Sequence, residues 1–207
     1  MKRCIVIGSM PVDFDLKSIV TPDDFIFCAD GGYLQAQKQG IEPDVIVGDF
    51  DSAPQPQNCT AKIEKLPVIK DDTATYHIAR QVIKDGFTHA VFCGVTGGRP
   101  DHTFANIQML KFLAQNGVNA QIIDKNSCYT VIKDGKIELP AKDNCYFSVF
   151  SLDEKCTGVS ETGGFYEIEN AELTNDYPIG VSNEFIGKPV TISVKKGSLL
   201  VITTGKD

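Results

Sequence analysis

The first half of the chain alternates short apolar runs with helical stretches. The runs lack the apolar–polar alternation of a half-exposed strand, so they predict strands that are buried on both faces. The helical character is clearest where Phe104, Ile107 and Leu110 fall near helical spacing. The predicted strands are Cys4–Gly8, Phe25–Ala29, Val45–Gly48, Ala90–Gly94 and Ala120–Ile123, and the predicted helices are Tyr33–Gln39, Thr75–Lys84 and Thr103–Gln115.

After about residue 128, strand-like runs follow one another and only turn residues separate them. No convincing long amphipathic helix is evident there. We therefore expect an α/β fold with two domains: an N-terminal parallel-sheet, Rossmann-like domain with helices on both faces (1–127) and a C-terminal all-β sandwich domain (128–207). The strands predicted in the second domain are Tyr129–Leu139, Tyr146–Leu152, Gly164–Ile168, Val190–Val194 and Ser198–Thr203.

Composition and charge narrow the classes of function. The 207 residues are 42% hydrophobic and 23% charged, which is typical of a globular protein with one or two domains. A formal net charge of −7, with no basic half, argues against nucleic acid as a partner. Seven cysteines without CxxC spacing predict free thiols in a reducing compartment. No run approaches the ~20 apolar residues of a membrane span, so we expect a cytoplasmic protein with no membrane partner.

Glycines and carboxylates follow four of the predicted parallel strands. In an open parallel sheet, ligands bind at the edge formed by the carboxyl ends of the strands. Because these segments converge on that edge, they predict a site for phosphate and a metal ion. The segments are Gly8-Ser9-Met10, Asp30-Gly31-Gly32, Gly48-Asp49-Phe50-Asp51-Ser52 and Thr96-Gly97-Gly98-Arg99-Pro100-Asp101-His102.

Asp49 and Asp51 are separated by one residue. On a strand end they would share a face, with Phe50 pointing the other way. Carboxylates so close together repel unless a cation lies between them, and Mg²⁺ combines a few carboxylate oxygens with substrate phosphates. The alternative is an acidic turn in which Ser52 caps the next helix. Asp30 at the neighbouring strand end favours the metal.

The turn at Gly31 and Gly32 has a structural interpretation as well. The glycines allow the chain to turn, and Asp30 can cap the helix that begins near Tyr33. Both interpretations are compatible, because the N–H groups at the start of a helix also bind phosphate.

A second glycine turn precedes the third predicted helix. Gly97 and Gly98 let the backbone approach a ligand closely, and the forked guanidinium of Arg99 suits phosphate oxygens. Asp101 either takes part in binding or only caps the helix expected from Thr103.

His102 and Asn106 lie four residues apart, on one helix face near its N-terminus. A lone histidine in such a position is more often structural than catalytic. The sequence has no GxxxxGK[ST] segment, so the nucleotide site is not a P-loop. No Ser-His-Asp or reactive-cysteine arrangement is evident.

In order and spacing, these segments resemble those of the thiamine pyrophosphokinase family. The resemblance covers nearly the whole chain, and GDFDS together with GGRPDH is highly specific. It is carried by Asp30-Gly31-Gly32, Pro43-Asp44, Gly48-Asp49-Phe50-Asp51-Ser52, Gly97-Gly98-Arg99-Pro100-Asp101-His102 with Asn106, Gly163-Gly164-Phe165-Tyr166 and Gly180-Val181-Ser182-Asn183-Glu184.

The resemblance implies an enzyme that transfers the pyrophosphoryl group of ATP to the hydroxyl of thiamine, giving thiamine diphosphate and AMP. It implies a catalytic domain over 1–127 that binds ATP and Mg²⁺, a thiamine-binding domain over 128–207, and a homodimer. Thiamine itself follows from the resemblance alone.

The resemblance also assigns roles to individual residues. Asp30, Asp49 and Asp51 would bind Mg²⁺ and the ATP phosphates. Asp49, Asp51 and Arg99 would be the catalytic residues, with Arg99 on phosphate. Thiamine would be held by Asp101, Ser182 and Asn183. The other residues expected to bind substrate are Gly31, Gly32, Thr73, Gly97, Gly98, His102 and Asn106.

One segment departs from the family pattern, in which a Thr-Asp pair at the start of the second helix supplies an acid to the metal site. Here the segment reads Lys70-Asp71-Asp72-Thr73-Ala74-Thr75. Depending on the register, Ala74 or Thr75 stands where the acid is expected. Asp71, Asp72 or a water molecule would then replace it.

Two other functions are compatible with the sequence. One is a pyrophosphokinase for another hydroxymethyl heterocycle, such as a pterin, and Ser182-Asn183 favours thiamine over it. The other is a non-catalytic protein that binds a nucleotide or thiamine, motivated by the missing acid. The retained pair of Asp49 and Asp51 argues against that function.

Overall fold

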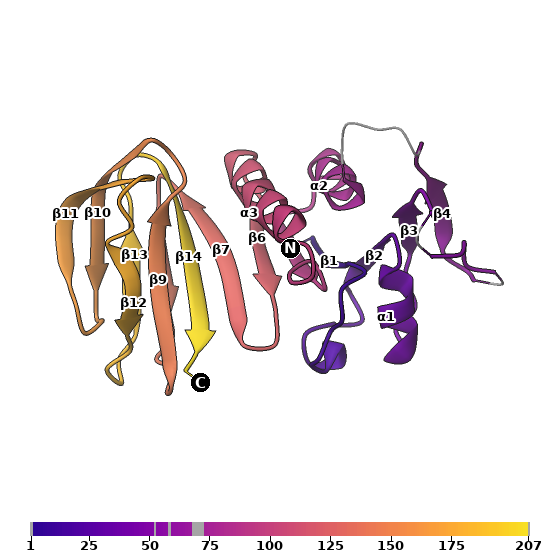
Figure 1. The fold of residues 1–207 in the computed structure, drawn as a ribbon, viewed down its shortest axis with the longest axis horizontal. Coiled ribbons are helices and arrows are strands. Elements are labelled where there is room, and N and C mark those ends of the chain that lie inside the picture. Colours follow the sequence, from indigo (N-terminus) through magenta and orange to yellow (C-terminus); the bar gives the residue numbers. More distant parts are fainter. Residues whose placement is uncertain (1, 52, 58, 68–72, 207) are drawn as a thin grey trace. The chain divides into compact units, whose positions relative to one another are not determined.

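In a computed structural model the chain folds into two compact units, Met1–Lys125 and Asn126–Asp207 (Figure 1). The structure describes residues 2–51, 53–57, 59–67 and 73–206. Ser52, Asp71 and Asp72, which enter the sequence analysis as a helix cap and as substitutes for an acid, lie outside the described residues. The fold is mixed α/β.

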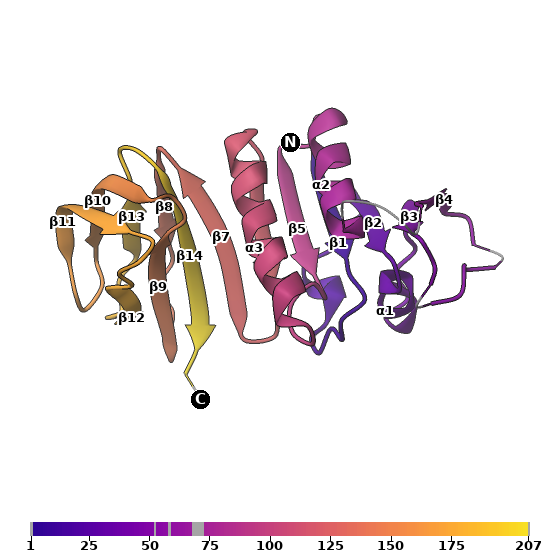
Figure 2. The same cartoon turned by 45° about the horizontal axis from the view of Figure 1, so that its top comes forward.

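The first unit contains a sheet in which every neighbouring pair of strands is parallel, in the order β6-β5-β1-β2-β3-β4. Helices α2 and α3 lie on one face and α1 on the other (Figures 1 and 2). The elements are β1 Arg3–Ile7, the 3-10 helix η1 Leu16–Ser18, β2 Phe25–Ala29, α1 Gly32–Lys38, β3 Val45–Gly48, β4 Lys62–Lys65, α2 Ala74–Lys84, β5 His89–Cys93, α3 Pro100–Gln115 and β6 Asn119–Ile123.

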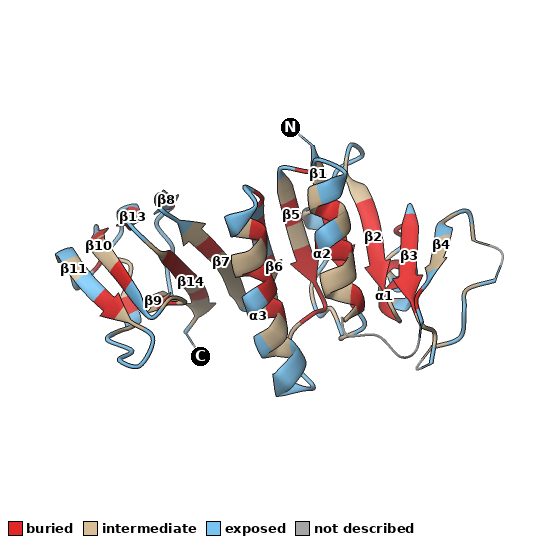
Figure 3. Cartoon of the chain, turned by 90° about the horizontal axis from the view of Figure 1, so that it is seen from above, coloured by how far each residue is buried: buried red, intermediate tan, exposed pale blue. Residues whose placement is uncertain are grey.

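The central strands of this sheet are buried on both faces, as their lack of alternation predicts (Figure 3). On one face Ile5, Ile7 and Cys28 pack in a cluster with Tyr33 and Ala36 of α1. Burial on both sides is typical of a parallel sheet, and the carboxyl ends of these strands lie along one edge of it.

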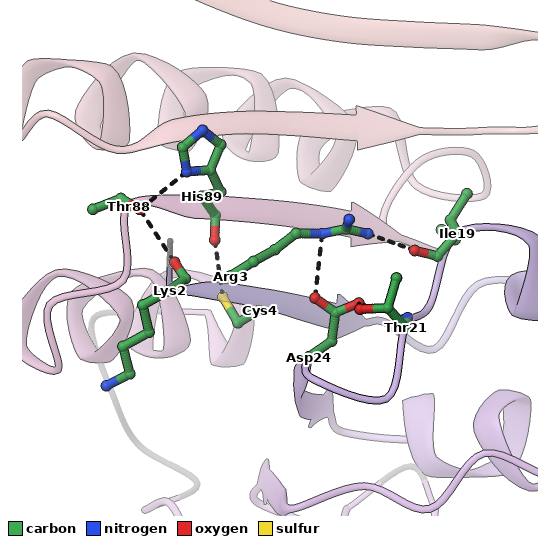
Figure 4. Close-up of polar contacts among 8 residues, drawn as sticks. All are labelled: Lys2, Arg3, Cys4, Ile19, Thr21, Asp24, Thr88 and His89. Carbon is green, nitrogen blue, oxygen red and sulfur yellow. Dashed lines mark hydrogen bonds and ion pairs between the residues drawn. The ribbon is translucent and has the colours of Figure 1, made fainter.

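An ion pair joins β1 to the segment before β2 (Figure 4). Arg3 Nε lies 3.3 Å from Asp24 Oδ1, and the Asp24 side chain is only 2% exposed. Arg3 Nη2 also donates to the carbonyl of Ile19, and Thr21 N donates to Asp24 Oδ2 at 2.7 Å. The ion pair and these hydrogen bonds compensate part of the cost of burying the charges. Arg3 is the first residue of β1, so these interactions hold the amino end of that strand.

The second unit contains two antiparallel sets of strands, in the orders β12-β9-β14-β7 and β11-β10-β13-β8. Both contribute to one apolar core, which includes Phe147, Val149, Val159, Ile192 and Leu199. The strands are β7 Ser127–Lys133, β8 Lys136–Leu139, β9 Cys145–Ser151, β10 Lys155–Thr162, β11 Ile168–Thr174, β12 Gly180–Glu184, β13 Val190–Ser193 and β14 Ser198–Gly205.

Some predicted elements of the second unit are wrong. The run Tyr129–Leu139 is two strands, because Asp134, with φ 46°, turns the chain. Gly164–Ile168 is not a strand: Gly164 makes only an isolated bridge to Phe185. Gly163 has φ 89°, and its N–H donates to Glu167 Oε1 at 2.7 Å, so this segment forms a turn before β11.

Four strands, β4, β10, β11 and β12, were not predicted, and α3 begins earlier than the predicted Thr103. Proline at the first helical position is favourable because its missing N–H would have no partner there, and α3 begins at Pro100. None of the described helices is long and apolar enough to cross a membrane.

Candidate active site

A cavity of about 770 Å³ lies in the first unit, where the segments that follow β1, β2, β3 and β5 meet the starts of α1, α2 and α3. This is the edge on which the sequence places its glycines and carboxylates. Nine of the residues expected to bind substrate or metal line it: Asp30, Gly31, Asp49, Asp51, Thr73, Gly97, Arg99, His102 and Asn106.

Five other expected residues do not line this cavity. Gly32 and Gly98 serve the close packing of its walls: a Cβ on Gly32 would lie 1.9 Å from the Ile7 carbonyl oxygen, and one on Gly98 2.7 Å from Met10 Sδ. Asp101 is paired with Arg99 on the adjoining surface. Ser182 and Asn183 belong to the second unit.

The cavity is also lined by residues to which sequence reasoning gave no role. They include Leu34 and Gln35 of α1, Ala53 and Val95. The only signal for Leu34 and Gln35 is their position in the first turn of a helix that follows a glycine turn.

The Asp30 carboxylate lies over Gly48 of the neighbouring segment. Asp30 has φ 49°, and its N–H donates to the Val47 carbonyl at 2.8 Å. A Cβ on Gly48 would lie 2.8 Å from Asp30 Oδ1. Glycine at position 48 therefore leaves the space that the Asp30 side chain occupies beside the cavity.

Asp49 and Asp51 reach the cavity through a geometry that differs from the predicted one. Strand pleating does not place them, because β3 ends at Gly48. Phe50 has the left-handed φ of 58° and packs against the apolar core, while Asp51 N donates to Asp49 Oδ1 at 3.3 Å. A bulky residue in this conformation is strained, and such strain clusters at functional sites.

The three aspartates do not form a preassembled metal site. Within the part of the chain that the structure describes, no three His, Cys, Asp or Glu side chains are grouped closely enough to hold a metal ion. Asp30, Asp49 and Asp51 share the lining of one cavity, and further ligands would have to come from a substrate or from water.

Thr73 has a structural role at the start of α2. It is the N-cap, and its Oγ1 accepts from Tyr76 N at 3.1 Å. Ala74 is buried and Thr75 is half-buried, and both line the cavity together with Thr73. The described part of the segment that departs from the family pattern, Thr73 to Thr75, therefore lies at this site.

Arg99 and Asp101 form an exposed bidentate pair. Arg99 Nε donates to Asp101 Oδ1 at 3.1 Å and Nη2 donates to Oδ2 at 2.5 Å. The Arg99 hydrogen bond lowers the pKa of Asp101 and raises that of Arg99. The fork predicted to hold phosphate is thus paired with Asp101.

Asp101 does not cap α3 in the way considered from the sequence. The N-cap position is Arg99, and Asp101 lies within the first turn. Its Oδ1 accepts from the adjacent His102 N at 2.9 Å. A carboxylate there still interacts favourably with the positive end of the helix.

The loop after β5 is held from two sides. Asn106, which is 5% exposed, donates from Nδ2 to the Val95 carbonyl at 2.7 Å. Thr96 Oγ1 donates to Asp124 Oδ2, after β6, also at 2.7 Å. Asn106 therefore supports the loop, and Asp124 is a supporting residue that the sequence analysis missed.

In the second unit, Ser182 and Asn183 are adjacent in β12 but differ in exposure. Ser182 is exposed and has φ 58°, whereas Asn183 is 5% exposed. Only Ser182 presents its side chain to solvent.

Comparisons with known proteins identify the family. Residues 16–122 match the family model described as thiamin pyrophosphokinase, catalytic domain, and residues 135–199 match thiamin pyrophosphokinase, vitamin B1 binding domain. The chain belongs to the thiamin pyrophosphokinase family. It is a kinase-type transferase, with thiamine and ATP as its substrates.

Individual relatives match over almost the whole chain. Thiamine pyrophosphokinase from Bacillus subtilis (strain 168) is 28% identical over 212 residues, which cover 98% of each protein. A crystal structure of the thiamine pyrophosphokinase from Bacillus subtilis has a TM-score of 0.90 at 24% identity, with 99% of each chain covered. That of thiamin pyrophosphokinase from Geobacillus thermodenitrificans has a TM-score of 0.88 at 25% identity, covering 100% of this chain and 99% of that one.

Replacing Arg99 by Gln should raise the pKa of Asp101 towards its ordinary value, because the main interaction that favours the ionised carboxyl is removed. The Asp101 carboxyl therefore stays ionised down to a lower pH in the parent protein than in the Arg99→Gln variant. The measurement is a carbon-13 NMR titration of the Asp101 carboxyl. Lys133→Gln is the matched control, since it breaks a similar exposed pair with Asp134 and should move only the Asp134 titration. An unchanged Asp101 curve in Arg99→Gln contradicts the pairing.

Proposed function

We propose that the cavity of the first unit is where the pyrophosphoryl group of ATP passes to the hydroxyl of thiamine. The observation that carries this proposal is that Asp30, Asp49, Asp51 and Arg99 line a single cavity of about 770 Å³. The first unit then acts as a Rossmann-like nucleotide domain, with ligands at the carboxyl ends of its strands.

In this reaction the thiamine hydroxyl oxygen attacks the β-phosphorus of ATP. The bond from that phosphorus to the oxygen it shares with the α-phosphorus breaks, and AMP leaves with the electron pair. The hydroxyl proton passes to one of the cavity carboxylates. Such transfers depend on in-line positioning and on neutralising charge, more than on covalent help from the protein.

Mg²⁺ is part of this proposal, and the donor set fits it. Asp30, Asp49 and Asp51 offer the carboxylate oxygens that this ion prefers, and Mg²⁺ usually takes one or two carboxylates and completes its octahedron with water and phosphate. Three preassembled protein ligands are therefore not required. When bound, the ion neutralises charge on the β- and γ-phosphates.

Arg99 is proposed to exchange Asp101 for a phosphate when ATP enters. Both side chains are well exposed, at 70% and 63%, so water screens their pair and separating them costs little. Exchange frees Asp101 to interact with thiamine. Gly31, Gly97, Thr73 and His102 line the same cavity and would complete the substrate contacts, while Gly32, Gly98 and Asn106 support its walls.

The second unit is proposed to contribute to thiamine binding around Ser182 and Asn183 and to form a homodimer. Support for the dimer comes from β12, which ends its set of strands and has large apolar residues exposed in and around it. These are Phe165, Tyr166, Tyr177, Ile179, Val181 and Ile186. All seven cysteines are free thiols, which supports a reducing compartment such as the cytoplasm.

Asp49→Ala and Asp51→Ala should each reduce turnover by several orders of magnitude, because loss of a metal-binding carboxylate removes transition-state charge stabilisation. The assay is AMP release from Mg·ATP with thiamine. Asp23→Ala, which removes an exposed acid outside the cavity, is the control for fold and net charge. Near-parental turnover in either cavity variant refutes the assignment.

Thr75→Asp should lower the Mg²⁺ concentration needed for half-maximal activity, because it adds a carboxylate to the cavity lining at a half-buried position. Thr75→Asn is the control, because asparagine has nearly the same shape as aspartate but carries no charge. Ala74→Asp would instead place a charge at a position that is 2% exposed, so it should lower stability. If the Mg²⁺ titrations of Thr75→Asp and the parent overlay, this segment does not act on the metal.

Sedimentation velocity at micromolar concentration should give a dimer. Ile186→Lys should favour the monomer, because it places a charge among the exposed apolar residues around β12. Lys188→Ala, at a nearby exposed position, should leave the dimer intact. A parent protein that is monomeric and fully active at this concentration contradicts the proposal.

A further inference from the structure

Glu161 is an acid in the interior of the second unit. It lies in β10 on the same side as Cys156 and Val159, which belong to the apolar core, and it is 3% exposed. Acids are almost never buried to this extent unless they are paired. The position is one at which an apolar side chain is expected.

The contacts of Glu161 only partly compensate its burial. Its Oε2 accepts from Asn183 Nδ2 at 3.2 Å, while the buried Oε1 has no hydrogen-bond partner among the described residues. Burial raises the pKa of the carboxyl, and the Asn183 hydrogen bond opposes that rise. The contribution of Glu161 to the free energy of unfolding is fully present below the ordinary pKa of glutamate. It is lost as the pH rises through the higher pKa that this carboxyl has in the folded state. The ionised form is therefore less favourable in the folded protein than the protonated form, and the burial of an acid at this position is not explained by packing alone.

Asn183 uses its whole hydrogen-bonding capacity within the protein. Its Oδ1 accepts from the backbone N–H groups of Tyr166, at 3.0 Å, and Glu184, at 2.8 Å. Its Nδ2 donates to the Tyr166 carbonyl at 2.7 Å and to Glu161 Oε2 at 3.2 Å. A side-chain amide donates two hydrogen bonds and its oxygen accepts two, so none is left for a ligand.

The amide of Asn183 clamps the turn Gly163–Tyr166 to β12. Gly164 packs against it, since a Cβ there would lie 3.0 Å from Asn183 Nδ2 and 2.7 Å from Phe147 Cζ. Phe165 N donates to the Glu184 carbonyl at 2.9 Å. The turn presents two exposed rings, Phe165 and Tyr166, whose centroids lie 4.9 Å apart in an edge-to-face arrangement.

Glu161 also fixes which way the amide points. Rotating the amide by 180° would place Oδ1 against Glu161 Oε2 and the Tyr166 carbonyl, and the NH₂ group against the N–H groups of Tyr166 and Glu184. All four would be contacts between groups of like polarity, so Glu161 adds to the backbone bonds that select one orientation.

We propose that Glu161 is a positioning residue for thiamine, acting through Asn183 on the turn that carries Phe165 and Tyr166. Asn183 then serves as the clamp, and Ser182 and the two rings face the substrate. This inference rests on the proposed contribution of the second unit to thiamine binding.

The test compares Glu161→Leu with Glu161→Gln. Leu removes the acceptor and should raise KM for thiamine about tenfold, which corresponds to the loss of one hydrogen bond. KM for ATP and kcat should stay within about twofold of the parent, since the catalytic cavity is untouched. Gln keeps an acceptor oxygen and should restore KM for thiamine.

Amide hydrogen exchange by NMR supplies a readout that involves no substrate. The N–H groups of Tyr166 and Glu184 should exchange faster in Glu161→Leu and as in the parent in Glu161→Gln. Val159→Ala is the matched control: it weakens the core on the same strand and should alter neither these amides specifically nor KM for thiamine. Gly164→Ala, which presses on the amide from the other side, should raise KM for thiamine and remains informative should Glu161→Leu fail to fold.

Two further variants separate failure of this inference from failure of the proposed function. If Ser182→Ala or Phe165→Ala raises KM for thiamine while Glu161→Leu and Gly164→Ala leave KM and exchange unchanged, only the positioning role is overturned. If none of the four variants changes KM for thiamine, the proposed contribution of the second unit is wrong, and the inference falls with it.

Discussion

The contact of main chain with main chain at the carboxyl end of β1 sets the position of the cavity lining. A Cβ on Gly32 would lie 1.9 Å from the Ile7 carbonyl oxygen, and one on Gly8 2.3 Å from that of Gly94. Only glycine permits these distances. As a result, α1 begins directly on the end of β1, and the loop after β5 crosses beside it. Asp30 and Arg99 are attached to segments that this packing aligns, and Asp30 in turn lies against Gly48, directly before Asp49 and Asp51.

The parts of the fold that the sequence predicts are those in which burial and local pattern agree. The buried strands of the first unit stand out as apolar runs. Strand β4 does not, because its sequence Lys62–Lys65 is polar and its residues are exposed or half-buried at the edge of the sheet. Strands β10 and β12 are interrupted by left-handed residues, Gly158 and Ser182, which break the alternation. Tertiary packing, rather than propensity, decides such segments.

For the site, the sequence identifies residue types better than it identifies roles. Asp49 and Asp51 both line the cavity as the sequence predicts, but the left-handed turn at Phe50 that brings them there, in place of strand pleating, has no sequence signal. The role of Asn183 was out of reach because its partners Glu161 and Tyr166 are 22 and 17 residues away. Whether every donor and acceptor of a side-chain amide has a partner depends on its surroundings in the folded protein, so a sequence motif cannot reveal it.

The outward-facing aromatic pair has a spectroscopic consequence. The sequence contains no tryptophan and six tyrosines, so tyrosine dominates the near-ultraviolet emission of the protein. Tyr166 is 66% exposed and its ring lies against Phe165. A ligand that stacks on this face meets one of the few natural chromophores directly, so its arrival changes the intrinsic fluorescence, and occupancy can be followed without attaching a dye.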